Sequence, residues 1–214
     1  MPNPPAVVVV IGASGCGKST VGQQLADVFA SPFIDADDLH PVENVEKMAA
    51  GVPLEDEDRL PWLLTVRQTA LRLASAQSPA NDQSGLCFVA CSALKRSYRD
   101  LLRGETESED QEEGFEESSK LDERARVFFI YLHGSPSLLL NRLTLRLSHF
   151  MRATMLDSQL AVLEPPNAGE EEGVVAIKLG EGEGETVERE REAVAEEARR
   201  RVEEWLEGNV GGEK

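Results

Sequence analysis

Cysteine is scarce in this chain of 214 residues, which argues against a protein held together by disulfides and against one built around a cysteine-bound metal. The three cysteines are Cys16, Cys87 and Cys91. An odd number at irregular spacing provides no disulfide framework, and the spacing fits no common set of metal ligands. Cys87 and Cys91 lie in an apolar run, so we expect both to be buried free thiols.

A long hydrophobic run is also lacking. The apolar stretch 6–11 is far shorter than the roughly 20 residues that a membrane-spanning helix needs. Residues 1–5 contain no basic segment followed by an apolar signal core. We therefore expect a cytoplasmic protein that has no membrane partner.

Basic residues are few relative to acidic ones: 22 Lys and Arg stand against 39 Asp and Glu, a formal net charge of −17. This balance argues against nucleic acid or an anionic membrane as a partner. Residues 104–124 carry ten acids against two bases, and residues 164–214 carry sixteen against seven. The remaining chain has thirteen of each, so its bases could still converge on one cleft and bind an anionic substrate.

Residues 104–124 also contain few apolar side chains. We predict that they form a disordered surface insertion in an otherwise single domain covering 1–214. The segment includes Thr106, Ser108, Ser118 and Ser119. A role in docking or phosphorylation stays open beside the simpler reading of a passive loop.

Hydrophobic periodicity indicates alternating strands and helices. Apolar runs predict strands at 6–11, 32–35, 86–91, 126–132 and 174–177. Helical spacing predicts helices at 18–30, 41–50, 60–76, 93–103, 135–147, 152–163 and 188–206. This alternation implies an α/β fold with a parallel sheet and helices on both faces. Such sheets bind ligands beyond the carboxyl ends of their strands, which would bring 12–19, 35–40, 92–95 and 133–135 around one crevice.

The strongest motif is GASGCGKS at residues 12–19, which matches the phosphate-loop pattern G-x-x-x-x-G-K-[ST] in full. A strand precedes it and a helix follows, so its backbone N–H groups would form an anion nest. We expect Lys18 to reach the β- and γ-phosphates of ATP and Ser19 to contact Mg²⁺. An ordinary glycine-rich turn would not explain a Lys-Ser pair at the start of a helix. The predicted ATP-binding residues are Gly12, Ala13, Ser14, Gly15, Cys16, Gly17, Lys18, Ser19 and Thr20.

Two acids follow the second predicted strand, Asp35 and Asp37. At the end of a strand next to a phosphate loop, one acid can orient the water shell of a metal ion. The other can hold or deprotonate a substrate hydroxyl. The alternative is a solvated turn in which Asp38 caps a helix.

Several further stretches together resemble the gluconokinase family, whose members share the fold of shikimate and nucleoside-monophosphate kinases. The matching stretches are 11–19, 33–41 (FIDADDLHP), 44–54, 58–63 (DRLPWL), 91–103 (beginning CSALK) and 129–132, with a weaker match from 142 to 165. The resemblance implies a three-layer α/β/α phosphate-loop kinase with a five-stranded parallel sheet and a small helical lid near 142–156. It implies that the γ-phosphoryl of ATP is transferred to the 6-hydroxyl of D-gluconate, and it suggests a homodimer.

The resemblance also implies roles for individual residues. Asp37 is the candidate base, and Asp35 would steady the hydration of Mg²⁺. The candidates for holding the sugar acid are His40, Lys47, Arg59, Lys95, Arg99 and His149. Guanidinium groups suit a carboxylate substrate, but Arg59 could instead pair with the acids before it and Lys47 could be a surface lysine. Trp62 and Trp205 are expected to be packing residues.

Arg142 and Arg146 fall in the expected lid and could neutralise charge on the transferred phosphoryl group. An exposed helix stripe is the alternative. Leu147 and Ser148 depart from the more basic, glycine-containing lid of the family. Two other functions compete with gluconate phosphorylation: another small-metabolite kinase of the same fold, and a non-catalytic ATP-binding scaffold that recruits partners through its acidic insertion.

Overall fold

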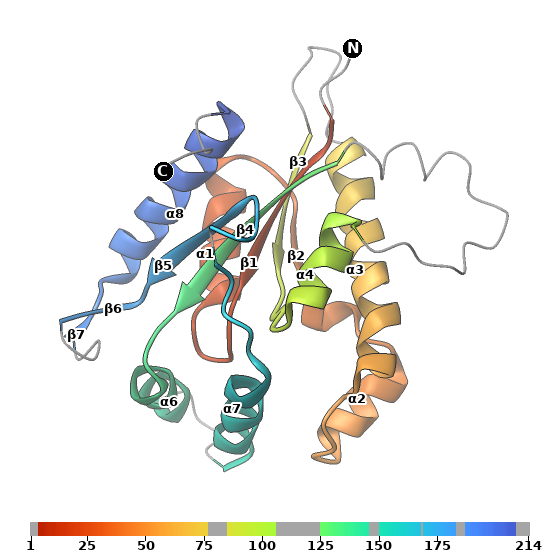
Figure 1. Ribbon diagram of the computed structural model, residues 1–214, viewed down its shortest axis with the longest axis vertical. Coiled ribbons are helices and arrows are strands. Elements are labelled where there is room, and N and C mark those ends of the chain that lie inside the picture. The colour runs from red at the N-terminus through yellow and green to blue at the C-terminus, as the bar shows by residue number, and fades with distance from the viewer. Residues whose placement is uncertain are drawn as a thin grey trace, which may run out of the picture.

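A computed structural model describes residues 4–76, 85–105, 125–145, 150–167, 169–182 and 187–208. Its centre is a sheet of five parallel strands that carries helices on both faces (Figure 1). The strands are β1 (Ala6–Ile11), β2 (Phe33–Asp35), β3 (Leu86–Ala90), β4 (Arg126–His133) and β5 (Val174–Lys178), in the spatial order β2-β3-β1-β4-β5. The expected α/β class and all five expected strands are confirmed. The expected insertion lies outside the described residues, except for Gly104 and Glu105.

The helices follow the strands in the order that the periodicity predicts. They are α1 (Lys18–Val28), the 3-10 helix η1 (Ala36–Leu39), α2 (Val42–Ala49), α3 (Asp56–Ala76), α4 (Arg96–Arg103), α6 (Pro136–Leu145), α7 (Phe150–Val162) and α8 (Arg191–Leu206). A small antiparallel pair, β6 (Gly180–Glu181) with β7 (Val187–Glu188), precedes α8. No helix in the described ranges is long and apolar enough to cross a membrane.

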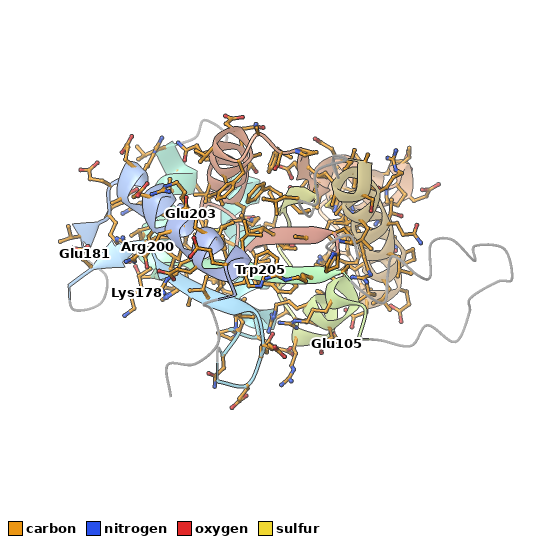
Figure 2. The ribbon with its side chains drawn as sticks, turned by 90° about the horizontal axis from the view of Figure 1, so that it is seen from above. Glu105, Lys178, Glu181, Arg200, Glu203 and Trp205 are labelled. Atoms are coloured by element: carbon orange, nitrogen blue, oxygen red, sulfur yellow. The ribbon has the colours of Figure 1, made fainter. Side chains whose placement is uncertain are left out.

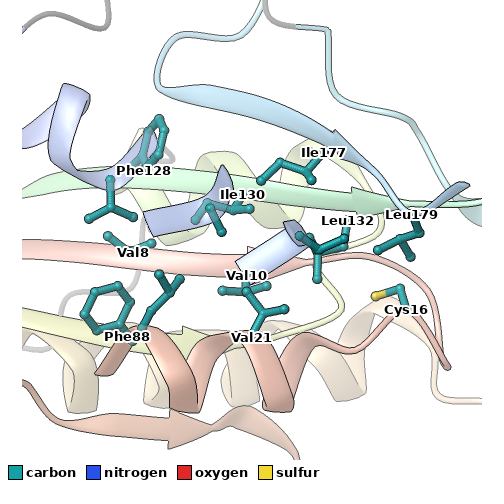
Figure 3. Packing of buried hydrophobic residues seen from close by; sticks show 14 of the residues in the cluster. Val8, Val10, Cys16, Val21, Phe88, Phe128, Ile130, Leu132, Ile177 and Leu179 are labelled. Atoms are coloured by element: carbon teal, nitrogen blue, oxygen red, sulfur yellow. The ribbon is translucent and has the colours of Figure 1, made fainter. Parts of the chain in front are cut away.

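The core has two halves because alternate residues of each strand point to opposite faces of the sheet. Val8 and Val10 of β1 belong to a buried cluster with residues of α1, α6 and α8. Figure 3 shows both valines in this cluster together with Val21 of α1. Val7 and Val9 pack with α3 and α4 on the other face. Both faces of β1 are therefore buried, which explains why its six residues are all apolar.

The cysteines and tryptophans behave as the sequence predicts. All three cysteines are buried free thiols, and burial raises the pKa of Cys87 and of Cys91 to about 12. Trp205 lies where α8 meets the sheet (Figure 2) and stacks on Phe128 with ring centroids 5.1 Å apart. Trp62 is buried against the opposite face of the sheet.

Some helix boundaries differ from the sequence-based expectation for identifiable reasons. Helix α3 begins at Asp56 rather than residue 60, because three acids in its first turn complement the positive end of the helix dipole. Helix α4 begins at Arg96 rather than residue 93, because Ala93 has a left-handed backbone (φ 39°) that no helix can include. Helix α8 begins at Arg191, after the β7 strand that the periodicity did not reveal.

Candidate active site

The phosphate loop connects β1 to α1 at the carboxyl edge of the sheet, and its glycines are needed for its shape. Gly12 has φ 141°, and a side chain there would lie 2.5 Å from the Leu132 carbonyl oxygen of β4. Gly15 and Gly17 also have positive φ, 85° and 99°. The amide of Gly12 donates to the carbonyl of Ser92, which ties the loop to the segment after β3. The loop thus presents its amides at the amino end of α1.

The two polar side chains at the start of α1 contact the loop itself and the end of β2. Nζ of Lys18 curls back over the loop and donates to the carbonyl of Ala13 at 3.3 Å. The Ser19 hydroxyl donates to Oδ2 of Asp35 at 2.6 Å. The fold therefore brings the loop and the end of β2 together, although they are separated by an entire helix in the sequence.

The Ser19–Asp35 pair fits a magnesium site. It offers a hydroxyl and a carboxylate oxygen, the hard ligands that Mg²⁺ takes in small number while keeping waters and substrate phosphates. Within the described ranges no group of three or more His, Cys, Asp or Glu side chains could hold a metal. Nucleotide phosphates and water would have to complete the coordination.

Asp37 is positioned by a short turn that Asp35 organises. Oδ1 of Asp35 accepts from the Asp37 amide at 3.2 Å and caps η1, so the cap is Asp35 rather than Asp38. The pKa of the Asp37 carboxyl is raised, first by its partial withdrawal from water and then by repulsion from Asp35. Positive charge on Lys18, and then on His40, acts in the opposite direction and lowers the pKa of Asp37. A carboxyl with this pKa is a stronger base than a fully solvated aspartate.

His40 directly follows η1 and is held in place by packing. Its ring stacks on Trp62 at a centroid distance of 4.0 Å, and its Nδ1 lies 3.4 Å from the side-chain nitrogen of Asn44. Burial and then the charge of Arg59 lower the pKa of His40, against the attraction of Asp37. The lowered pKa favours the uncharged imidazole, which can take part in hydrogen bonds through either ring nitrogen.

Two lysines reach toward the same end of α3. Lys47 of α2 contacts Asp58, with Nζ 2.5 Å from Oδ1. Lys95, the residue before α4, lies with its Nζ 2.7 Å from both oxygens of Asp56. The Tyr98 hydroxyl donates to the same carboxylate. Hydrogen bonds from Lys95 and then Tyr98 lower the pKa of Asp56.

Arg59 lies between these groups. Its Nε donates to the carbonyl of Leu54 at 3.2 Å, and its charge affects the pKa of His40, Asp56 and Asp58. Of the predicted acceptor-binding residues, His40 therefore lies near Asp37, whereas Lys47, Arg59 and Lys95 gather around the amino end of α3. Asp56, Tyr98 and Asn44 join them although the sequence analysis did not name them. Asp56 and Tyr98 lie in or beside the matching stretches, which is the one signal that could have identified them.

Arg99, which the resemblance suggested as a substrate-binding residue, lies apart from this group. Its side chain is 1% exposed, and its Nε and Nη2 donate to the two oxygens of Glu171 at 2.8 and 2.6 Å. Its Nη1 donates to the carbonyls of Ala93 and Leu94. Every part of the guanidinium is engaged inside the protein, so Arg99 links α4 to the segment before β5.

Arg142 of α6 contacts the phosphate loop and β7. Its Nη1 donates to the Cys16 carbonyl at 3.1 Å, and its Nε donates to Glu188 of β7 at 2.8 Å. Arg142, Cys16 and Glu188 line a cavity of about 230 Å³ beside the loop. Thr20, Gln24 and Arg191 also line it. The cavity adjoins the amino end of α1, so a nucleotide with its phosphates on the loop could extend into it.

The other two residues expected in the lid, Arg146 and His149, lie outside the described residues, as do Leu147 and Ser148. The structure gives α7 an additional contact with the phosphate loop. Oε1 of Gln159 accepts from the Ser14 amide at 2.7 Å. Nothing in the local sequence of α7 indicated this bond, because its two partners are 145 positions apart.

Comparison with known proteins gives one consistent answer. A family model described as shikimate kinase matches residues 14–61. A probable gluconokinase from Xenopus tropicalis is 44% identical over 165 residues, which is 77% of this chain and 81% of that protein. The thermosensitive gluconokinase of Escherichia coli K12 is 35% identical over 186 residues, 87% of this chain and 86% of that protein.

Solved structures agree. The crystal structure of a gluconokinase from Sinorhizobium meliloti 1021 superimposes with a TM-score of 0.70 at 35% identity and covers 96% of both chains. An APS kinase from Mycobacterium tuberculosis, at 16% identity and a TM-score of 0.58, shares the fold alone. Because relatives of this identity align over more than two thirds of both chains, and because the phosphate loop is intact, this chain belongs to the gluconokinase family of phosphate-loop kinases.

Proposed function

We propose that this protein transfers the γ-phosphoryl group of ATP to the 6-hydroxyl of D-gluconate, giving 6-phospho-D-gluconate and ADP. One observation carries the proposal: Ser19 of the phosphate loop donates to Asp35 at 2.6 Å, and Asp35 accepts from the Asp37 amide at 3.2 Å, so the loop and Asp37 lie at the same edge of the sheet. Such a pairing is what a kinase with an alcohol acceptor needs. The names of the relatives supply the identity of the acceptor.

ATP would bind with its phosphates on residues 12–20 and its base in the cavity beside Thr20 and Arg142. Lys18 would leave the Ala13 carbonyl, 3.3 Å away, for the β- and γ-phosphates. Ser19 and Asp35 would hold Mg²⁺, which neutralises phosphate charge when bound. Arg142, fixed between Cys16 and Glu188, would add positive charge on the same side.

Gluconate is a polyol with one carboxylate, and the acceptor side offers groups for both. Arg59 and Lys95 carry positive charge for the carboxylate. An uncharged His40 would bond a hydroxyl, and Lys47 would close the outer side. Lys47 and Lys95 are now paired with Asp58 and Asp56. The substrate carboxylate would therefore compete with protein carboxylates for them, which favours an acceptor with several contacts.

The transfer itself balances simply. Asp37 accepts the proton of the 6-hydroxyl, the oxygen forms a bond to the γ-phosphorus, and the bond from that phosphorus to the β–γ bridging oxygen breaks so that ADP leaves. The raised pKa suits Asp37 to this role, because it narrows the difference in pKa between the carboxyl group that accepts the proton and the alcohol that gives it up. Cations around the phosphoryl group stabilise the charge that spreads over its oxygens.

The test is ADP release by the purified protein with Mg-ATP and a panel of acceptors. Gluconate should stimulate release strongly, whereas shikimate and nucleoside monophosphates should not. Stimulation by one of those acceptors would identify a different kinase of this fold. Tight ATP binding with no acceptor-stimulated release would favour the non-catalytic scaffold.

A further inference from the structure

Helix α7 and the residues that directly follow it contact both halves of the candidate active site. Gln159 accepts a hydrogen bond from the Ser14 amide of the phosphate loop at 2.7 Å. Five residues later, Oε2 of Glu164 accepts from the Arg96 amide, the first of α4, at 2.6 Å. The backbone amide of Glu164 donates to the Leu94 carbonyl at 2.9 Å. One short segment thus bonds the loop that would hold ATP and the turn that carries Lys95.

The position of α7 is fixed by packing, so these bonds are not incidental. Leu156 is 1% exposed and belongs to the same buried cluster as Cys16 of the phosphate loop. Leu160 packs against that cluster one turn later. Because the helix is anchored on its inner side, Gln159 is held against the phosphate loop, and Glu164, two residues beyond the end of the helix, is held against the start of α4.

The types of residue also fit the contacts. Lys95 precedes α4 and supplies no side-chain cap, so the first amides of that helix need an acceptor from elsewhere. The Glu164 carboxylate supplies it and also complements the positive end of the helix. At the phosphate loop the acceptor is an uncharged amide, which satisfies Ser14 without bringing negative charge to a site for polyphosphate.

We infer that Gln159 and Glu164 are positioning residues for phosphoryl transfer: together they clamp the phosphate loop to the amino end of α4 and fix the donor relative to the acceptor-binding Lys95. This inference rests on the proposed function. Neither residue touches the reacting atoms; both act through the backbone of the segments that do. Transfer is sensitive to such positioning, because misplacement by about 1 Å can cost two orders of magnitude in rate.

The experiment compares Gln159→Met, Glu164→Met and the double variant with the parent protein. Methionine keeps the length of each side chain and removes the acceptor. Asp157→Asn is the matched control, because Asp157 is exposed on the same helix. For each protein, kcat, the KM for ATP and for gluconate, gluconate-independent ATP hydrolysis and Tm are measured.

We expect each single variant to lower kcat roughly three- to tenfold, the range set by one lost hydrogen bond. The share of ATP lost to water should rise, while Tm changes little. The double variant should be less impaired than the product of the two single effects, because releasing one end already opens the clamp. Glu164→Gln, which keeps an acceptor oxygen, should restore most of the rate. The Ser14 amide should exchange hydrogen faster in Gln159→Met alone.

Two results would overturn the inference. Independent effects that multiply in the double variant would show that the bonds do not act as one clamp. A lowered Tm with kcat and coupling unchanged would show a purely structural role. If the parent protein itself released no ADP in response to gluconate, the proposed function would fail, and this would be known before any variant was compared.

Discussion

Replacing Arg99 with methionine should destabilise the protein severely and leave its chemistry intact. The guanidinium is 1% exposed and donates to both oxygens of Glu171 and to two backbone carbonyls. Methionine fills much of the same space but donates nothing. Glu171, itself buried, would keep only the longer contact with Arg103 at 3.4 Å.

The magnitude follows from leaving a buried charge without its main partner. Removing one member of a buried ion pair costs about 3–5 kcal/mol. For a chain of this size each kcal/mol lowers Tm by about 2–4 °C, so Tm should fall by roughly 6–20 °C. The double variant Arg99→Met, Glu171→Met should regain most of this loss, because a buried ion pair replaced by apolar side chains is often neutral for stability.

The loss should also depend on pH. Burial raises the pKa of Glu171, but the hydrogen bonds and charges of Arg99 and Arg103 outweigh it and leave the pKa lowered. A carboxylate with a lowered pKa contributes stability above its unfolded value of about 4.3 and loses it as pH falls through the folded value. The difference between parent and Arg99→Met should therefore be largest at neutral pH and should narrow below about pH 4.

Urea unfolding followed by tryptophan fluorescence is a suitable assay, since Trp62 and Trp205 report on opposite faces of the sheet. Arg96→Met is the matched control: Arg96 is on the same helix, 53% exposed and 3.8 Å from Asp100. It should change the free energy of unfolding by less than about 1 kcal/mol. Unchanged stability in Arg99→Met together with a raised KM for gluconate would refute this reasoning and return Arg99 to the substrate site.

Three further predictions concern the active site. Lys18→Ala should abolish ADP release in the coupled assay while Tm stays within a few degrees. Asp37→Asn should lower kcat at least 100-fold with little change in ATP affinity measured by calorimetry. Because the pKa of Asp37 is raised, the activity of the parent protein should begin to fall on acidification at a pH above about 3.9, the usual pKa of an aspartate. A pH–activity profile that is the same in the variant as in the parent would contradict the role of Asp37 as the base. Gly12→Ala should abolish ATP binding, because the methyl group would lie 2.5 Å from the Leu132 oxygen; Gly51→Ala, also at positive φ but with open space, is the control and should bind ATP normally.

The framework of the fold was predictable because it depends on local patterns. The six apolar residues of β1, the glycines that follow and the Lys-Ser pair define a strand, a loop and a helix with little help from the rest of the chain. Asp35 and Asp37 follow the same rule, since residues after parallel strands meet at one edge.

The parts that the sequence analysis missed depend on partners far along the chain. The predicted helix at 93–103 included both Lys95 and Arg99, but the left-handed backbone of Ala93 delays the start of the helix to Arg96, so Lys95 lies outside it. The guanidinium then meets Glu171, 72 positions away, which no local pattern reveals. The β6–β7 pair has two residues in each strand, too few for any periodicity to appear.

The buried thiols of Cys87 in β3 and of Cys91, the residue directly after it, can report on opening of the sheet. With a pKa of about 12, only about one molecule in 10⁵ carries a thiolate at Cys87 or Cys91 at pH 7, so alkylating reagents should pass both by while the strand stays paired between β1 and β2. The rate at which Cys87 or Cys91 is alkylated would then report how often the strand separates from its neighbours. Comparing this rate with and without nucleotide would measure how much a ligand at the edge of the sheet slows opening at its centre.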